Sequence, residues 1–205
     1  MIIAVSGSQG SGKTTLLNGL SQRGYSVIER KTSRSILSDW GVTLSEVNNH
    51  PNLTVRFQNE ILKRKIADER EAAISNDVFL TERSMADLWV YSLVALGKDN
   101  EYSSWLDDYY EQCKEAQASY AGIVYLTAGH FHPVDDGVRA TNQHYSKMVD
   151  LLMTHYINQI TPTDTLTIID TPQLDHRVNV IVSAIQNKYS IMNELQPITK
   201  VKGEQ

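Results

Sequence analysis

Cysteine is almost absent from this sequence, because Cys113 is the only one in 205 residues. A single thiol cannot close an intramolecular disulfide, which separates the chain from small secreted proteins that depend on such cross-links. We therefore expect a cytoplasmic protein in which Cys113 is buried as a small apolar side chain. No apolar run approaches the roughly 20 residues of a membrane-spanning helix. The first apolar residues lead directly into a glycine-rich motif, so we also expect no signal peptide.

An excess of positive charge is also missing. The chain has 19 Lys and Arg against 24 Asp and Glu, which gives a formal net charge of −5. This balance argues against a protein that coats nucleic acid with a generally basic surface. Local basic grooves remain compatible with it, and residues 30–34 and 63–65 are the stretches that could contact a DNA backbone. The length predicts one sizeable domain.

The clearest motif of the sequence lies near its N-terminus and fits G-x-x-x-x-G-K-[ST], the phosphate-binding P-loop. Glycines allow this loop to curl around an anion, and the N-terminus of the following helix attracts negative charge. Lys13 is expected to reach the β- and γ-phosphates of ATP, and the Thr14 hydroxyl is expected to bind Mg²⁺. The residues predicted to hold the nucleotide are Gly7, Ser8, Gln9, Gly10, Ser11, Gly12, Lys13, Thr14 and Thr15.

Strand-like and helix-like segments alternate along most of the chain. Apolar patterning predicts strands over 2–5, 25–28, 77–81, 121–126 and 165–169. It predicts helices over 15–20, 57–74, 85–96, 103–118, 142–160 and 174–187. Residues 41–52 look polar and turn-rich, with Pro51 barring a continuous helix. This alternation predicts an α/β fold with a parallel sheet that helices cover on both faces.

The P-loop occurs together with three short motifs: a strand ending in Glu29, a strand ending in Glu82-Arg83-Ser84, and a late Asp-Gly-Val-Arg segment, residues 136–139. With these motifs the sequence resembles the P-loop nucleoside and nucleotide kinases. It is most similar to the bacterial and phage ATPase/kinase-like branch, which is related to nicotinamide riboside kinase domains. The resemblance covers about residues 1–187 and implies a three-layer sandwich with strand order 2-3-1-4-5 and a lid near residues 127–145. Residues 188–205 are predicted to form a tail outside this domain.

The resemblance also implies roles for residues beyond the P-loop. Glu82-Arg83-Ser84 matches the Glu-Arg-Ser of deoxyribonucleoside kinases, which makes Glu82 a ligand of Mg²⁺ or of its waters. Arg83 would then face the phosphate or the acceptor. Glu29 resembles the general base of nucleoside kinases, and Arg34 matches an arginine that holds the acceptor. Arg139 resembles a lid arginine that stabilises the transferring phosphoryl group.

These features predict an ATP-dependent kinase that phosphorylates a hydroxyl or a phosphate of a nucleoside- or nucleotide-like acceptor. Arg30 and Lys31 lie next to Glu29 and favour an anionic acceptor, so a hydroxymethylpyrimidine base in phage DNA is one of the options. The alternative is a P-loop ATPase that acts as a nucleotide-dependent switch on a protein partner. The sequence leaves the acceptor and the oligomeric state open.

Overall fold

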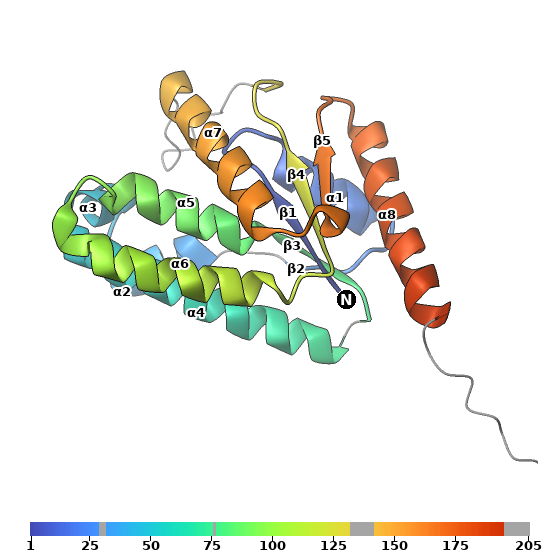
Figure 1. The fold of residues 1–205 in the computed structure, drawn as a ribbon, viewed down its shortest axis with the longest axis horizontal. Coiled ribbons are helices and arrows are strands. Elements are labelled where there is room, and N and C mark those ends of the chain that lie inside the picture. The colour runs from blue at the N-terminus through green and yellow to red at the C-terminus, as the bar shows by residue number, and fades with distance from the viewer. Residues whose placement is uncertain (29–31, 76, 132–141, 195–205) are drawn as a thin grey trace, which may run out of the picture.

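A parallel β-sheet forms the centre of the molecule (Figure 1). The computed structural model describes residues 1–28, 32–75, 77–131 and 142–194. The sheet has five parallel strands in the order β2-β3-β1-β4-β5, as the sequence predicts. The strands are β1 (Ile2–Ser6), β2 (Val27–Ile28), β3 (Phe79–Glu82), β4 (Gly122–Leu126) and β5 (Leu166–Ile169).

Helices cover both faces of the sheet (Figure 1). One face packs against α1 (Lys13–Gln22) and α8 (Leu174–Glu194), and the other against α4, α5, α6 and α7. The strand β1 shows how the sequence achieves this, since Ile3 and Val5 are buried towards α1 and α8 and Ala4 is buried towards α5. Successive residues of a strand point to opposite faces, so a strand buried on both sides must be apolar throughout. The remaining helices are α2 (Thr32–Trp40), α3 (Leu44–Asn49), α4 (Pro51–Ser75), α5 (Met85–Leu96), α6 (Ser103–Gln117) and α7 (Gln143–Ile160).

The prediction that residues 41–52 are turn-rich is wrong in part, because these residues contain α3 and the start of α4. Thr43 and Glu46 form a capping box that begins α3, with Glu46 N–H donating to Thr43 Oγ1 over 3.2 Å. Pro51 opens α4 instead of blocking it. The first turn of a helix has no intrahelical partner for its N–H groups, so a proline costs nothing there.

Two other helix boundaries differ from the prediction. The short helix α2 lies in a stretch for which the sequence predicts no helix, and α8 runs to Glu194 beyond the predicted end at residue 187. The boundaries of α5 agree with the prediction, and α7 starts after Asn142, whose side chain accepts from His144 N–H at 2.9 Å. Cys113 is fully buried, as expected. No helix among the described residues is long and apolar enough to cross a membrane.

A buried ion pair lies between α4 and β3. Lys65 and Glu69 are 0% and 4% exposed and pair with each other, and Lys65 Nζ also donates to Thr81 Oγ1 at 3.1 Å. The Tyr120 hydroxyl donates to Glu69 at 3.2 Å. Because Lys65 is enclosed in this network, the expectation that residues 63–65 could contact DNA is wrong for Lys65.

We expect Lys65→Met to lower the free energy of unfolding by about 3–5 kcal/mol, because it leaves the Glu69 carboxylate buried without its cation. Lys63→Met is the matched control, since Lys63 is exposed on the same helix, and we expect a change within about 0.5 kcal/mol. Urea unfolding of the two variants measures the difference. Equal, small losses in both would show that the buried pair contributes nothing to stability.

Candidate active site

The P-loop lies between β1 and α1. At two of its glycines, a residue with a side chain would be unfavourable. Gly7 has φ 144°, and a Cβ atom there would lie 2.6 Å from the Leu126 carbonyl oxygen of β4. Gly12 has φ 89°, and its Cβ would lie 2.8 Å from Arg177 Nη1. Both positions combine a backbone angle that side chains disfavour with a close neighbour, which is a main-chain oxygen at Gly7 and the end of the Arg177 side chain at Gly12.

The loop has the donors that a phosphate requires. Lys13 is 5% exposed, and its Nζ donates to the carbonyl oxygens of Gly7 at 2.7 Å and Ser8 at 2.8 Å, which holds the ammonium inside the loop. The Ser8 hydroxyl is buried and has no hydrogen-bond partner among the described residues. A buried hydroxyl without a partner is costly, and a phosphate oxygen would satisfy it. The residues of the loop therefore fit a bound nucleoside triphosphate.

Two oxygen ligands meet at the end of the loop. The parallel pairing of β1 with β3 places Val5 opposite Glu82, so Glu82 reaches the start of α1. Thr14 Oγ1 lies 3.5 Å from Glu82 Oε1. A hydroxyl and a carboxylate suit Mg²⁺, which prefers oxygen ligands and retains several waters. The described residues contain no cluster of three or more His, Cys, Asp or Glu side chains that would suit a different metal.

Arg83 follows Glu82 in an unusual backbone conformation. Its φ of 67° is the only positive value at a described residue other than glycine. Its guanidinium lies over the Tyr91 ring, with Cζ 4.8 Å from the ring centroid. Burial opposes the charge, but nearby Tyr91, Asp87 and Glu82 outweigh it and raise the pKa of Arg83 above its ordinary value. A permanently charged group thus lies near Glu82, one of the two candidate metal ligands.

A second arginine approaches the loop from the other side of the site. Arg177 of α8 is 2% exposed, and its Nη1 donates to the Ser11 carbonyl at 2.6 Å while its Nε donates to the Thr171 carbonyl. Its guanidinium lies 5.2 Å from the centroid of the Phe131 ring. Burial lowers the pKa of Arg177, an effect that the Asp170 carboxylate partly offsets. Arg177 therefore joins the P-loop to the segments that follow β4 and β5.

Those two segments are also joined directly. Asp170, after β5, accepts hydrogen bonds from Thr127 Oγ1 at 2.6 Å and interacts with His130 Nε2 at 2.7 Å. Hydrogen bonds from Thr127 and His130 hold the pKa of Asp170 below its usual value. The loop after β5 is therefore fixed against the loop after β4.

The structure brings together most of the residues that the sequence predicts for the site. The P-loop from Gly7 to Thr15, Glu82 and Arg83 meet at the carboxyl ends of β1 and β3. Arg34 lies exposed in the first turn of α2, the helix after β2. Glu29, Arg139 and the middle of the predicted lid lie outside the described residues.

Sequence reasoning missed three residues of this region: Asp87, Phe131 and Arg177. Asp87 stands three residues after Ser84, a spacing typical of helix starts that could have drawn attention to it. Phe131 and Arg177 carry no such signal. Arg177 reaches Ser11 across 166 residues of sequence, which only the tertiary fold brings into contact.

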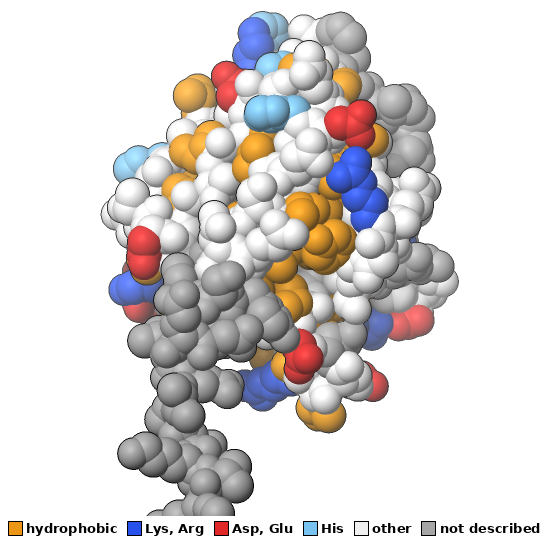
Figure 2. Space-filling model, turned by 90° about the vertical axis from the view of Figure 1, so that its right-hand side faces the viewer, with side chains coloured by type: hydrophobic (Ala, Val, Ile, Leu, Met, Phe, Trp, Pro, Cys, Tyr) orange, Lys and Arg blue, Asp and Glu red, His pale blue; other side chains and the backbone are white. Residues whose placement is uncertain are grey.

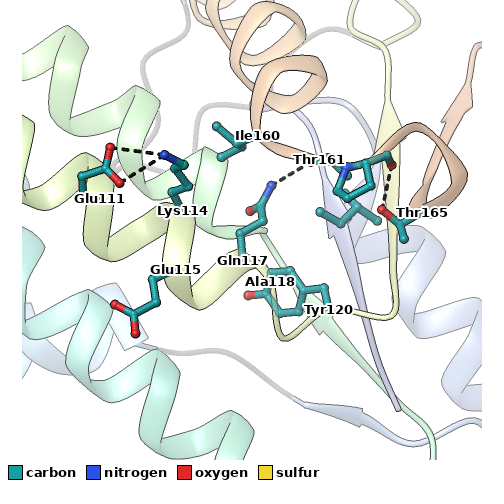
Figure 3. Close-up of a pocket in the computed structure, with 11 residues that line it drawn as sticks. Glu111, Lys114, Glu115, Gln117, Ala118, Tyr120, Ile160, Thr161 and Thr165 are labelled. Carbon is teal, nitrogen blue, oxygen red and sulfur yellow. Dashed lines mark hydrogen bonds and ion pairs between the residues drawn. The ribbon is translucent and has the colours of Figure 1, made fainter.

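A cavity of about 560 Å³ lies at the opposite edge of the sheet (Figure 3). Its walls come from the end of α6, the end of α7 and the residues just before β4 and β5. Several of its polar side chains are paired: Gln117 donates to Thr161 at 2.9 Å, and Lys114 to Glu111 at 3.2 Å. Among the described residues, none of its lining side chains has a buried polar atom without a hydrogen-bond partner, whereas the P-loop has the Ser8 hydroxyl.

The side of the molecule that carries α8 and β5 has a mixed surface (Figure 2). Apolar side chains gather in the middle of this face, and basic and acidic side chains border them (Figure 2). Among the side chains of β5 and α8 that the structure describes, Ile168 and Leu174 are the large exposed apolar ones. This face is not the uniformly basic surface that a DNA backbone would require.

The fold and the loop define a nucleotide-binding protein of the P-loop α/β class. Within that class, the chain belongs to a family described as AAA domain, whose model matches residues 2–171. No curated protein matches the sequence.

Two solved proteins share this fold. Deoxyadenosine kinase from M. mycoides, with dCMP and dCDP bound, superposes with a TM-score of 0.70 at 14% identity over 91% of this chain and 100% of that one. NadR in complex with NR superposes with a TM-score of 0.70 at 14% identity over 92% of this chain and 51% of that one. These similarities show a P-loop kinase-like fold.

We expect Gly12→Ala to weaken nucleotide binding, whereas Gly24→Ala leaves it unchanged. The two glycines have nearly the same φ, 89° and 88°, but a Cβ atom at Gly24 meets nothing within 4 Å. In both variants the free energy of unfolding should therefore fall by roughly 1–2 kcal/mol, because alanine disfavours a positive φ. Only Gly12→Ala adds the contacts with Arg177 and Phe131. Calorimetry with a non-hydrolysable ATP analogue and urea unfolding measure both effects, and equal affinity in the two variants contradicts the crowding argument.

Proposed function

We propose that this protein is an Mg-ATP-dependent kinase that phosphorylates a hydroxyl or a phosphate of a nucleoside- or nucleotide-like acceptor. The observation that carries the proposal is the meeting of Thr14 and Glu82, 3.5 Å apart, beside the charged Arg83. A P-loop and a metal ligand alone would also suit an ATPase. A fixed cation near them would stabilise the charge of the transferring phosphoryl group, and the similarity of the fold to kinases favours an acceptor other than water.

In this proposal, residues of the chain have the following roles. The backbone of the P-loop, Ser8 and Lys13 bind the phosphates, and Thr14 and Glu82 hold the cation. Arg83 supports the transferring phosphoryl group from the β3 side. When bound, Mg-ATP supplies the phosphoryl group, and its metal ion neutralises part of the phosphate charge.

The acceptor is assigned to the side of β2 and α2. Arg34 lies exposed there, and Glu29 would orient the attacking hydroxyl from the same sheet edge, because the carboxyl ends of parallel strands face one way. Arg139 would approach from the lid. Phe131 and Arg177 are assigned to the nucleoside end of ATP, because they join the loops that follow β4 and β5 to the P-loop. We also propose a cytoplasmic location, where Mg-ATP is available and the buried Cys113 needs no disulfide.

The direct test is transfer of labelled γ-phosphate from ATP to a panel of nucleosides, nucleotides, nicotinamide riboside and hydroxymethylpyrimidine DNA. We expect transfer to a nucleoside or nucleotide, and Lys13→Ala should lower the rate by orders of magnitude because it removes a cation from the β- and γ-phosphates. Lys98→Ala removes an exposed lysine after α5 and serves as the control with unchanged rate. Transfer to none of the acceptors, with ATP hydrolysis that only a protein partner stimulates, would replace the kinase by a nucleotide-dependent switch.

Salt dependence separates the anionic acceptors in the same assay. A free nucleotide makes few phosphate contacts, so its affinity should fall gently with salt. For a DNA acceptor, the logarithm of the affinity should fall with the logarithm of the salt concentration, with a slope of about −0.7 to −0.9 per phosphate neutralised.

The role of Glu82 has its own test. We expect Glu82→Gln to raise the Mg²⁺ concentration that gives half-maximal activity, because an amide binds a hard divalent cation more weakly than a carboxylate does. Glu71→Gln removes an exposed carboxylate of α4 and is the matched control. Superimposable Mg²⁺ titrations of the two variants and the wild type would remove Glu82 from the metal site.

A further inference from the structure

A carboxylate that the proposed chemistry does not use lies between the P-loop and the Glu82–Ser84 turn. Asp87 of α5 is fully buried. Its Oδ2 accepts from Ser6 Oγ at 2.5 Å, from Ser84 Oγ at 2.8 Å and from Ser84 N–H at 2.8 Å. Its Oδ1 accepts a longer bond, 3.4 Å, from Gly7 N–H. We propose that Asp87 is a positioning residue that locks the start of the P-loop to the turn that carries Glu82 and Arg83.

Capping α5 explains only half of these bonds. Ser84 and Asp87 form a capping box, in which the side chain of the third helical residue accepts from the N-terminal cap. Such a box works at an exposed helix start, whereas burying a carboxylate costs free energy unless donors surround it. Here the further donors, Ser6 and Gly7, come from β1 and the P-loop. The same carboxylate therefore holds two segments that are about 80 residues apart in sequence.

The turn that Asp87 holds is strained. Arg83 has φ 67°, a conformation that costs a non-glycine residue free energy and persists only where surrounding contacts impose it. Its own N–H donates to the Val5 carbonyl at 2.8 Å. On one side, Lys65 Nζ donates to the Glu82 carbonyl at 3.3 Å, and on the other, Asp87 binds the Ser84 N–H. Asp87 is thus one of the contacts that force the turn into this conformation.

The negative charge of Asp87 also attracts the Arg83 guanidinium. Asp87 therefore bears on the position of both cations of the site: it anchors the Gly7 end of the loop that encloses Lys13, and through Ser84 it holds the backbone that follows Arg83. Loss of the bridge should let the loop and the turn shift relative to each other.

Two variants test this bridge. Asp87→Asn keeps the size of the side chain but places an NH₂ group where one carboxylate oxygen accepted. Ser6→Ala removes only the donor on the β1 side and leaves the capping box intact. Ser92→Ala is the matched control, because the Ser92 hydroxyl is also buried on α5 but donates at 2.9 Å only to the Leu88 carbonyl of its own helix.

We expect Asp87→Asn to lower turnover by about 10–100-fold, the range measured for residues that orient ligands without touching substrate. Both Asp87→Asn and Ser6→Ala should weaken binding of a non-hydrolysable Mg-ATP analogue measured by calorimetry and corrected for the folded fraction. Ser92→Ala should change thermal stability alone. A purely structural role would lower stability in all three and leave the affinity of the folded protein unchanged.

The turnover readout depends on the proposed kinase activity, whereas the binding readout does not. If the wild type transfers phosphate to no acceptor, the kinase proposal fails and analogue binding still decides the role of Asp87. If Asp87→Asn does not fold, Ser6→Ala decides it. Wild-type analogue affinity in folded Ser6→Ala overturns the bridge and leaves Asp87 as a helix cap.

Discussion

The close contact between the P-loop and the end of β4 is the constraint on which the site depends. A Cβ at Gly7 would lie 2.6 Å from the Leu126 carbonyl, so the first residue of the loop must be glycine and the loop must lie against the central sheet. The contact is possible because β1 is flanked by β3 and β4, whose carboxyl ends reach the same edge. Three features therefore lie close together at this edge: the N–H groups of the P-loop, Glu82 and the loop after β4.

Buried charged side chains form hydrogen bonds with the residues at the carboxyl end of β3. The Lys65–Glu69 pair lies behind β3 and reaches the Glu82 carbonyl, and Asp87 lies between β1 and the start of α5. Charges away from water are costly unless they are paired and hydrogen-bonded, and both groups have several partners here. These partners offset the cost of burial and also fix the position of Glu82 and Arg83, the two residues with the proposed roles in metal binding and phosphoryl transfer.

The opposite side of the loop depends on Arg177, which connects α8, the β5 loop and the Ser11 carbonyl. Its Nη2 is buried without a partner among the described residues, and its guanidinium supports the Phe131 ring. Phe131 is itself 43% exposed, so an aromatic surface faces solvent next to the phosphate loop. A flat nucleobase would stack well on such a surface, which agrees with the assignment of this end to the nucleoside.

The sequence by itself determined the P-loop, the alternation of strands and helices and, through a resemblance, the strand order. These features are local or periodic: a glycine pattern, an apolar strand and a helical repeat are each readable within a short window. It misjudged Pro51, because a proline that breaks a helix interior also suits a first helical turn, and the sequence alone did not show which applied. Only the tertiary structure decided that Lys65 is buried rather than available to DNA, that Asp87 bridges β1 and α5, and that Arg177 reaches the P-loop. Each of these depends on contacts between residues far apart in sequence, which strand pairing and helix packing create and no short pattern encodes.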